Sequence, residues 1–314
     1  MTGAAQKNIS RGIFLAVLAT LLWSGNFIVA KAVNRQIPPV SLNFFRWFTA
    51  SLIILPFAIK SFREDWPVIR HSWHYLFWVS MTGIALFNTF VYVGAHYTSA
   101  INLALIGTTS SPIMSVIFAR IFLKEKIGIM KLAGLLLCII GVLTLLSNGK
   151  WENLLHLHFG TGDLWVLLAA FCFSIYNTLV KKKPSGIKPL SFLLTTFAAG
   201  TLMVVPFFWI EWSKAAPVVW DYPLVLSVLY LGLFASVVCF YIWNIAIGEL
   251  GAGRTALFGN LIPVFSSIEA AILLHESFTT VHIISMAIVF TGIAVANYTT
   301  GAIRLTNKAP GRES

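Results

Sequence analysis

The chain contains a duplicated sequence. Residues 12–57 align without a gap to 162–207, and after one extra residue the match continues between 100–141 and 251–292. Each copy contains five apolar segments of about 20 residues, which is the length that crosses a bilayer as a helix. An odd number of crossings makes the second copy enter the bilayer from the opposite side. The sequence therefore predicts an inverted repeat, through which many secondary transporters expose a central site to each side in turn.

Composition supports a protein that lies in lipid. Of 314 residues, 58% are hydrophobic and 11% are charged, and the mean hydropathy is +0.83. A soluble globule is nearer half apolar and a quarter charged. We therefore expect an all-α membrane protein whose ten transmembrane helices form two inverted five-helix repeats around a central cavity. The expected helices lie near residues 12–33, 41–60, 74–97, 99–123, 128–147, 162–181, 188–210, 222–247, 253–274 and 280–301.

The distribution of basic residues predicts how the chain is oriented. About sixteen Lys and Arg residues fall in segments on one side of the expected helices and four on the other. The positive-inside rule then places both termini in the cytosol. The first apolar segment matches an internal one, so we expect it to be retained as a span and not cleaved as a signal. The expected organisation is a tail at 1–11, a first repeat at 12–147, an outer loop at 148–161, a second repeat at 162–301 and a tail at 302–314.

Enzyme and metal signatures are weak in this chain. It has no HExxH, GxSxG or phosphate-binding glycine loop. Gly160–Asp163 spells GxGD, but Asp163 stands where a helix is expected to begin and is better explained as a cap. Cys138, Cys172 and Cys239 show no metal-ligand spacing. We expect a non-enzyme without cofactor or metal. The net charge of +11 does not indicate nucleic-acid binding, because the basic residues stand at helix ends.

Two charged residues stand well inside expected spans. Arg46 and Glu269 each lie about five residues from the outer end of a span, where a charge is costly unless a partner offsets it. One hypothesis is that they face the interior and either pair directly or bracket a substrate that carries ammonium and carboxylate groups. The alternative is that Arg46 snorkels to the headgroups and Glu269 meets water alone.

Polar and aromatic residues near mid-span are candidates for lining the cavity. A buried amide or hydroxyl needs a partner, so these side chains face other helices or water. For any single residue, a contact between helices is as good an explanation as a position in the cavity wall. Taken together, the residues favour a cavity wall. The candidates are Trp23, Ser24, Asn26, Asn88, Tyr92, Tyr176, Asn177, Tyr241, Trp243, Asn244 and Asn260.

Two prolines and two glutamates stand at matching places in the copies. Pro112 and Pro263 occur within helices, where a proline leaves a carbonyl without its donor and allows bending. We interpret them as candidate gating hinges, although kinks without a moving role are equally common. Glu125 and Glu276 follow the same helices and are expected to cap helix ends or pair with nearby bases.

These residues resemble the drug/metabolite transporter superfamily and its EamA-type exporters. The resemblance is carried by Trp23-Ser24-Gly25-Asn26-Phe27, by Arg46, and by Pro112 followed by Lys124-Glu125-Lys126, Gly134 and Gly141, with Pro263, His275-Glu276 and Gly292 in the second copy. It covers nearly the whole chain. The second copy departs from the pattern with Phe173 opposite Trp23 and Thr196 opposite Arg46.

The resemblance implies export of small polar metabolites, such as amino acids, across a bacterial inner membrane by alternating access. Exporters of aromatic amino acids look similar to this chain. Two alternatives stay open: a nucleotide-sugar or organic-phosphate antiporter of the same superfamily, and a membrane receptor or assembly factor that transports nothing. The expected partners are a small-molecule substrate and the lipid bilayer, with no nucleic acid and no obligatory protein partner.

Overall fold

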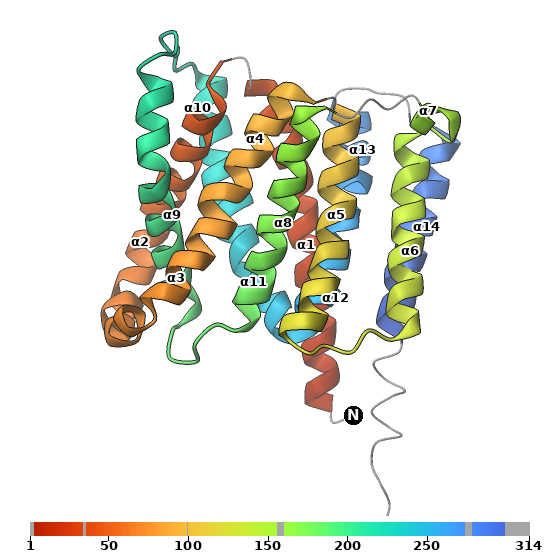
Figure 1. Cartoon of the computed structure of the whole chain (residues 1–314), viewed down its shortest axis with the longest axis horizontal. Coiled ribbons are helices and arrows are strands. Elements are labelled where there is room, and N and C mark those ends of the chain that lie inside the picture. Colours follow the sequence, from red (N-terminus) through yellow and green to blue (C-terminus); the bar gives the residue numbers. More distant parts are fainter. Residues whose placement is uncertain (1–2, 34–35, 99, 156–159, 274–277, 299–314) are drawn as a thin grey trace, which may run out of the picture.

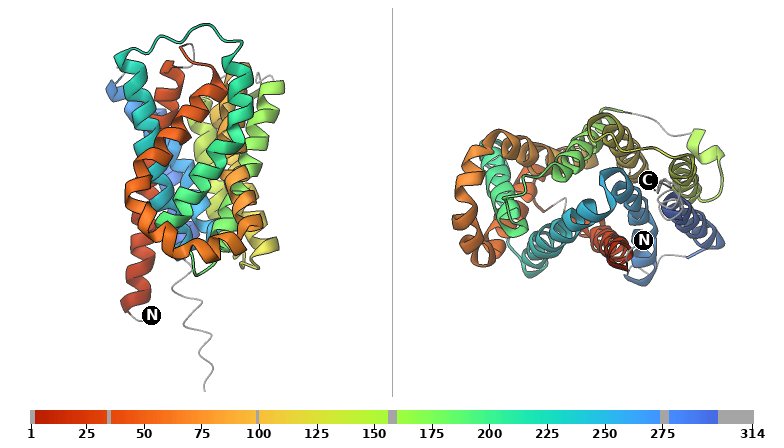
Figure 2. Two further views of the ribbon diagram at one scale, coloured as in Figure 1. Left: turned by 90° about the vertical axis from the view of Figure 1, so that its left-hand side faces the viewer. Right: turned by 90° about the horizontal axis from the view of Figure 1, so that it is seen from below.

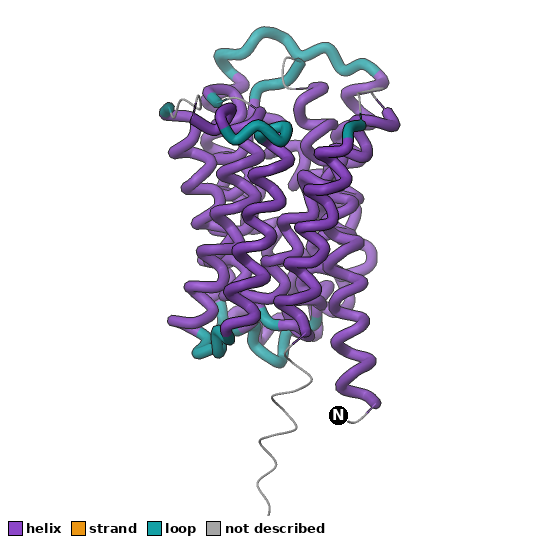
Figure 3. The backbone as a smooth tube through the Cα atoms, turned by 90° about the vertical axis from the view of Figure 1, so that its right-hand side faces the viewer, coloured by secondary structure: helices purple, strands orange, loops and turns teal. Residues whose placement is uncertain are grey.

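The computed structural model describes residues 3–33, 36–98, 100–155, 160–273 and 278–298, and this part of the chain contains helices and no strands. Long helices run side by side, with loops at both ends (Figures 1 and 3). The elements are α1 Gly3–Val33, α2 Pro39–His71, α3 Trp73–Ser80, π-helix η1 Met81–Leu86, α4 Phe87–Tyr97, α5 Ala100–Phe122, α6 Ile129–Leu146, α7 Glu152–Leu155, α8 Thr161–Lys181, α9 Pro189–Trp212, α10 Tyr222–Gly232, π-helix η2 Leu233–Val238, α11 Cys239–Leu250, α12 Ala252–Leu257, 3₁₀-helix η3 Phe258–Asn260, α13 Leu261–Leu273 and α14 Thr280–Tyr298.

Eight helical segments are long and apolar enough to cross a membrane by length and composition, among the residues that the structure describes. Two of the ten expected spans are not among them. The fourth corresponds to α5, whose apolar stretch is the shorter Ile106–Phe122. The ninth is divided into α12, η3 and α13. The prediction of an all-helical, multi-pass membrane protein is confirmed, whereas the number ten is not.

Corresponding helices of the two copies run in opposite directions. Figure 1 shows α1 rising from the end where the chain begins, while α8 descends towards that end. The contacts between helices also correspond in the two copies: α4 and α5 of the first copy pack on α8 of the second, and α11 and α13 of the second copy pack on α1 of the first. We call the end with the N-terminus and the loops 123–128 and 182–188 the basic end. The loops 148–151 and 213–221 lie at the opposite end.

Helices α2 and α9 are joined at both ends by reciprocal caps. Asp65 near the end of α2 accepts from the backbone N of Lys188, 2.8 Å away, at the start of α9. Glu211 near the end of α9 accepts from the backbone N of Ser41 at 2.7 Å and from that of Val40 at 3.2 Å. A carboxylate satisfies helix-start N–H groups and favours the positive end of the helix dipole. Helix α2 continues beyond the expected span 41–60 as far as His71, so Asp65 lies within the helix.

Glu125 makes a similar cap between the copies. Its carboxylate accepts from the backbone N of Ala252 at 3.1 Å, at the start of α12, and from Lys131 Nζ at 3.4 Å. The sequence predicted a capping or pairing role, and both contacts are of that kind. Its counterpart Glu276 lies outside the described residues.

Helices α6 and α14 meet through small residues at duplicated positions, at one edge of the bundle (Figure 2). A Cβ added to Gly134 would lie 2.4 Å from the carbonyl oxygen of Gly292, and one added to Gly292 would lie 2.7 Å from that of Gly134. One added to Gly141 would lie 3.0 Å from the carbonyl oxygen of Ser285, whose position matches Gly134. Small residues let two backbones approach this closely in lipid.

We predict that Gly134→Ala destabilises the protein. Alanine in an open helical position would stabilise by about 1 kcal/mol, but here the added methyl meets a backbone oxygen, and overpacking costs about 1–3 kcal/mol. Thermal unfolding in detergent should show a lower Tm than the parent. Gly128→Ala is the matched control, because nothing lies within 4 Å of its added Cβ. Equal Tm values for the two variants would contradict the close approach.

Candidate functional site

A central cavity lies between the two halves, with a volume of about 90 Å³. Ligand pockets usually measure about 300–1,000 Å³, so the conformation observed holds this cavity partly closed. Six of the candidate residues line it, and they are Trp23, Asn26, Arg46, Asn88, Pro112 and Trp243. The wall between them is largely apolar, formed by residues of α4, α5, α8, α12, η3 and α13.

Arg46 is the charged residue in the lining of this cavity, and it is 1% exposed. Every hydrogen bond found for its guanidinium goes to a neutral acceptor. Nη1 donates to Asn26 Oδ1 at 3.1 Å, Asn88 Oδ1 at 3.0 Å and Tyr92 Oη at 2.9 Å. Nε donates to Ser236 Oγ at 2.7 Å. The side chain does not snorkel, and no carboxylate pairs with it among the described residues.

The remaining bond of the guanidinium goes to a carbonyl released by the π-helix η2. In an α-helix the N–H of Cys239 would donate to the carbonyl of Ala235, but here it bonds to the carbonyls of Phe234 and Ser236. The Ala235 oxygen instead accepts from Arg46 Nη2 at 2.9 Å and from Trp23 Nε1 at 2.8 Å. Such π turns are often found at functional sites. Here the turn supplies a backbone acceptor that a regular helix would have used itself.

The first copy carries the matching π-helix, η1. Its Ala85 accepts at the carbonyl from Thr89 Oγ1 at 2.6 Å and from Asn43 Nδ2 at 3.5 Å. The two π turns are therefore symmetric in place but differ in what they hold, because Thr196 stands opposite Arg46. Sequence reasoning missed both turns, together with Ala235 and Ser236.

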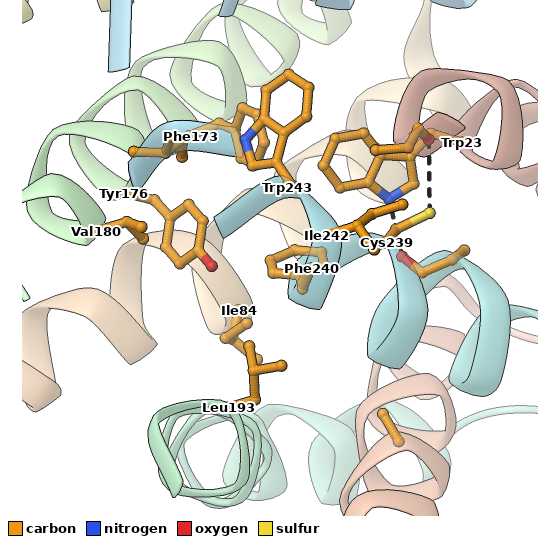
Figure 4. Close-up of a cluster of buried hydrophobic side chains, with 14 of the residues drawn as sticks. Trp23, Ile84, Phe173, Tyr176, Val180, Leu193, Cys239, Phe240, Ile242 and Trp243 are labelled. Carbon is orange, nitrogen blue, oxygen red and sulfur yellow. Dashed lines mark hydrogen bonds between the residues drawn. The ribbon is translucent and has the colours of Figure 1, made fainter. Parts of the chain in front are cut away.

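Aromatic side chains close the cavity towards the basic end. The ring centroids of Trp23 and Trp243 lie 4.9 Å apart, and those of Trp23 and Phe173 lie 5.8 Å apart. Tyr176 stacks on Phe173 at 5.8 Å and meets Phe240 edge-on at 5.5 Å. Figure 4 shows these side chains meeting from α1, α8 and α11. We call Trp23, Phe173, Tyr176, Phe240 and Trp243 the aromatic layer.

Other candidate residues support this layer and do not line the cavity. Asn177 accepts from Trp243 Nε1 at 2.9 Å and donates to Ser115 Oγ at 3.3 Å. Tyr176 is fully buried, and its hydroxyl donates to Asn244 Oδ1 at 2.8 Å. Asn244 and Tyr241 line a different pocket, nearer the basic end. These candidates therefore lie in the layer between two pockets or in the lining of the second pocket.

Glu269 stands apart from Arg46. Its Oε1 accepts from Ser24 Oγ at 2.7 Å, and its Oε2 has no hydrogen-bond partner among the described residues. The ion pairs in the described part of the chain join Arg11 to Glu249, Lys131 to Glu125 and Lys188 to Glu64. The direct Arg46–Glu269 pair, one of the two arrangements considered from the sequence, does not occur here.

The two prolines differ in their local effect. α5 continues through Pro112, whereas the helix before Pro263 changes to the 3₁₀-helix η3 over Phe258–Asn260. Pro263 has no N–H for the carbonyl of Gly259, but Pro112 lacks its N–H as well, so the missing donor alone does not explain the change of helix type. Asn260 is fully buried in η3 and donates to the carbonyl of Leu257 at 2.9 Å. It is a backbone-bonded residue that does not line the cavity.

Comparison with known proteins identifies relatives over nearly the whole chain. The model of the EamA-like transporter family matches residues 10–147 and again residues 160–298. The uncharacterized transporter YyaM of Bacillus subtilis is 28% identical over 299 residues, covering 93% of this chain and 95% of the relative. A protein of Escherichia coli named "Probable amino-acid metabolite efflux pump" is 25% identical over 292 residues, covering 90% and 93%.

A solved crystal structure shares the fold. It superposes with a TM-score of 0.75 and covers 94% of this chain and 99% of its own, at 19% sequence identity. At that identity the likeness concerns architecture alone. The arrangement of helices described above therefore also occurs in an experimental structure.

We predict that Arg46→Lys destabilises the protein. Lysine carries three N–H donors and arginine five, so at least two of the five hydrogen bonds would be lost in a buried setting, and an acceptor left without any partner costs about 1–3 kcal/mol. We expect the free energy of unfolding to fall by about 2–4 kcal/mol, measured as a lower Tm in detergent. Arg120→Lys, at an exposed position on α5, is the control. An unchanged Tm for Arg46→Lys would show that the network adds little stability.

Proposed function

This chain belongs to the EamA-like transporter family, and on that premise we propose that it exports amino acids or closely related metabolites across the membrane by alternating access. It is a transporter and not an enzyme, as the sequence predicted and as the names of its relatives agree. The observation that carries the choice of substrate is the unpaired positive charge of Arg46 at the wall of the central cavity.

A carboxylate is the group that this site accommodates best. Nη1 of Arg46 has three acceptors for its two hydrogens, so one of Asn26, Asn88 and Tyr92 can leave without an N–H being lost. Asn88 also has a buried Nδ2 with no partner among the described residues. A substrate carboxylate would accept from both groups and neutralise the buried charge.

Aromatic walls suit the rest of an amino acid. Trp23, Phe173 and Trp243 present apolar faces to the cavity, which would pack against a side chain and exclude water. The efflux-pump name of the Escherichia coli relative points to the same class of substrate. A nucleotide sugar or organic phosphate would require more than one cationic side chain in the cavity. Among the described lining residues, Arg46 is the one cation.

Glu269 is proposed to receive the ammonium group. Its free Oε2 is a buried acceptor, and Ser24 ties it to α1 directly after Trp23, which lines the cavity. In this conformation Glu269 does not line the cavity, so the contact would form when α13 moves. The two charged residues would then bracket the substrate without pairing with each other.

Alternating access follows from the architecture that we propose. Eight spans together with α5 and the α12–η3–α13 segment would make ten crossings, and the two family matches would correspond to two inverted repeats. Pro112 and the η3–Pro263 break lie on packed neighbours, since α5 contacts both η3 and α13. Bending at both places would open the cavity to one end and close it to the other.

Orientation is proposed from the positive-inside rule. The basic end, with Lys181–Lys183 and the N-terminus, would face the cytosol, and both termini would lie there. The membrane would be a bacterial inner membrane, as the resemblance implies and as the bacterial origin of relatives such as the Escherichia coli protein supports. Export then means loading at the basic end and release at the opposite end.

We predict that amino acids, and not their amides, exchange through the protein. In proteoliposomes preloaded with unlabelled amino acids, labelled ones should accumulate by counterflow above the level in empty liposomes. An amino-acid amide lacks the carboxylate that Arg46 would bind, and charge-assisted hydrogen bonds contribute about 1.5–3 kcal/mol. The amide should therefore compete at least about tenfold less well. Equal competition by the amide would reject the carboxylate role, and no uptake of any amino acid would reject the substrate class.

We also predict that Glu269→Gln weakens transport without unfolding the protein. The glutamine carbonyl can still accept from Ser24, so Tm should stay within a few degrees of the parent. Loss of the negative charge should raise the KM for amino acids about tenfold, as expected from losing one charge-assisted contact. Counterflow kinetics measure KM, and Glu152→Gln, in the exposed helix α7, serves as the control. A KM equal to that of the parent would remove Glu269 from the site.

A further inference from the structure

A second pocket lies below the central cavity, at the basic end between α8, α9 and α11. Its volume is about 310 Å³, within the usual range of ligand sites. Among its lining residues are Lys181, Lys183, Tyr241, Asn244 and Gly248. We call it the basic-end pocket.

The basic-end pocket carries positive charge without an acidic side chain in its lining. Lys181 is held at its edge by the end of α11, where Nζ donates to the carbonyl of Gly248 at 2.7 Å and to that of Ile247 at 3.3 Å. Lys183 donates to the carbonyl of Ile187. The acidic group whose charge acts on Lys183 is Asp65, and it caps α9 instead of lining the pocket. Both cations therefore bond to neutral carbonyls, as Arg46 bonds to neutral acceptors.

Asn244 gives this pocket an unused donor. Its Oδ1 accepts from Tyr176, while its Nδ2 is buried and has no hydrogen-bond partner among the described residues. Asn88 has the same arrangement in the central cavity, with Oδ1 bonded to Arg46 and Nδ2 without a partner. Each pocket thus combines positive charge with a free amide N–H, and this combination suits a carboxylate.

A single layer of side chains separates the two pockets. Phe173 and Trp243 line the central cavity, while Val180 and Asn244, further along the same two helices, line the basic-end pocket. Tyr176 lies between them: its ring stacks on Phe173 and its hydroxyl bonds to Asn244. Figure 4 shows Tyr176 between Phe173 and Val180 on α8, facing Phe240 of α11.

Tyr176 can occupy this place because Gly83 of η1 has no side chain. A Cβ at Gly83 would lie 2.0 Å from Cδ2 of the tyrosine ring. Helices α8 and α11 and the π turn η1 therefore meet at Tyr176, which is joined to α11 by its hydrogen bond to Asn244.

We propose that the basic-end pocket is a second binding site on the transport path, that it receives the carboxylate of the transported molecule, and that the Tyr176–Asn244 hydrogen bond closes its connection to the central cavity. The identity of the ligand rests on the proposed function. The carboxylate would use Nδ2 of Asn244, whereas the closure uses Oδ1 of the same amide, so binding and closure are tested separately.

The charge of the pocket is tested with a cysteine reporter at Gly248, where an added Cβ meets nothing within 4 Å. Inside-out vesicles, which expose the basic end in the proposed orientation, are treated with an anionic and a cationic methanethiosulfonate reagent. Gly248→Cys should react faster with the anionic reagent, and Lys181→Gln or Lys183→Gln should lower the ratio of the two rates at least about threefold. Lys182→Gln, which removes a charge outside the lining, is the matched control. The proposed site is overturned if Lys181→Gln and Lys183→Gln leave the ratio of the anionic to the cationic labelling rate unchanged. It is also overturned if Lys182→Gln lowers that ratio equally.

The connection is tested with a reporter in the central cavity. Ser111→Cys places a thiol in the cavity lining, and its labelling from the basic end should rise between about twofold and tenfold in Tyr176→Phe and in Asn244→Val, the range for losing one neutral hydrogen bond. Tyr75→Phe removes another hydroxyl bonded to α8, at the Leu179 carbonyl, and should change nothing. The parent chain, whose three cysteines are buried, gives the background.

The outcomes separate this proposal from the proposed function. Labelling needs no transport, so failure of amino-acid uptake with the labelling pattern intact would reject the substrate and leave the two-pocket path as a route for other anions. Labelling that is unchanged in both Tyr176→Phe and Asn244→Val, or raised equally by Tyr75→Phe, overturns the closure whatever is transported. Tm values of the variants show that each comparison is made on folded protein.

Discussion

A positive charge buried without an acidic partner is the constraint on which the centre of this molecule depends. A guanidinium in hydrocarbon is costly unless its N–H groups are all directed at acceptors. Arg46 meets this demand with side chains from α1 and α4 and with Ala235 and Ser236 of η2. A regular helix at η2 would use the Ala235 carbonyl for its own ladder. The π turn thus supplies an acceptor that the arginine uses, and together they join helices of both halves.

The duplication explains much of the packing, and the departures from it explain the site. α2 and α9 cap each other at both ends, and where α6 crosses α14 the Gly134–Gly292 contact is matched by the Gly141–Ser285 contact. Such reciprocal contacts are what a twofold relation produces. The symmetry fails where chemistry is concentrated: Thr196 replaces Arg46, and η3 interrupts the helix opposite the continuous α5. One half thus provides the charge, and the other provides the carbonyl that holds it.

The apolar segments and the duplication were sufficient to predict an all-helical membrane protein, because lipid allows few alternatives to long helices. The family was predicted from the resemblance carried by residues such as Trp23 and Arg46. The cost of burying Arg46 marked it as a special residue, but its partners were not predictable, since they come from helices distant in sequence. The π turns have no compositional signature, as they differ from α-helix by one hydrogen-bond step. The polar end of α2 was misjudged for a related reason: its Asp65 is explained by α9, which sequence alone does not place beside it.

A preassembled set of neutral acceptors also sets how tightly such a site can hold its ligand. If Arg46 stood bare, a carboxylate would gain the whole interaction and would be slow to leave. Because three acceptors already share the two hydrogens of Nη1, a carboxylate gains the difference between its own bond and the one it displaces. When it departs, Asn26, Asn88 or Tyr92 restores the satisfied state. A transporter needs this near balance, since its binding site must release on one side what it accepts on the other.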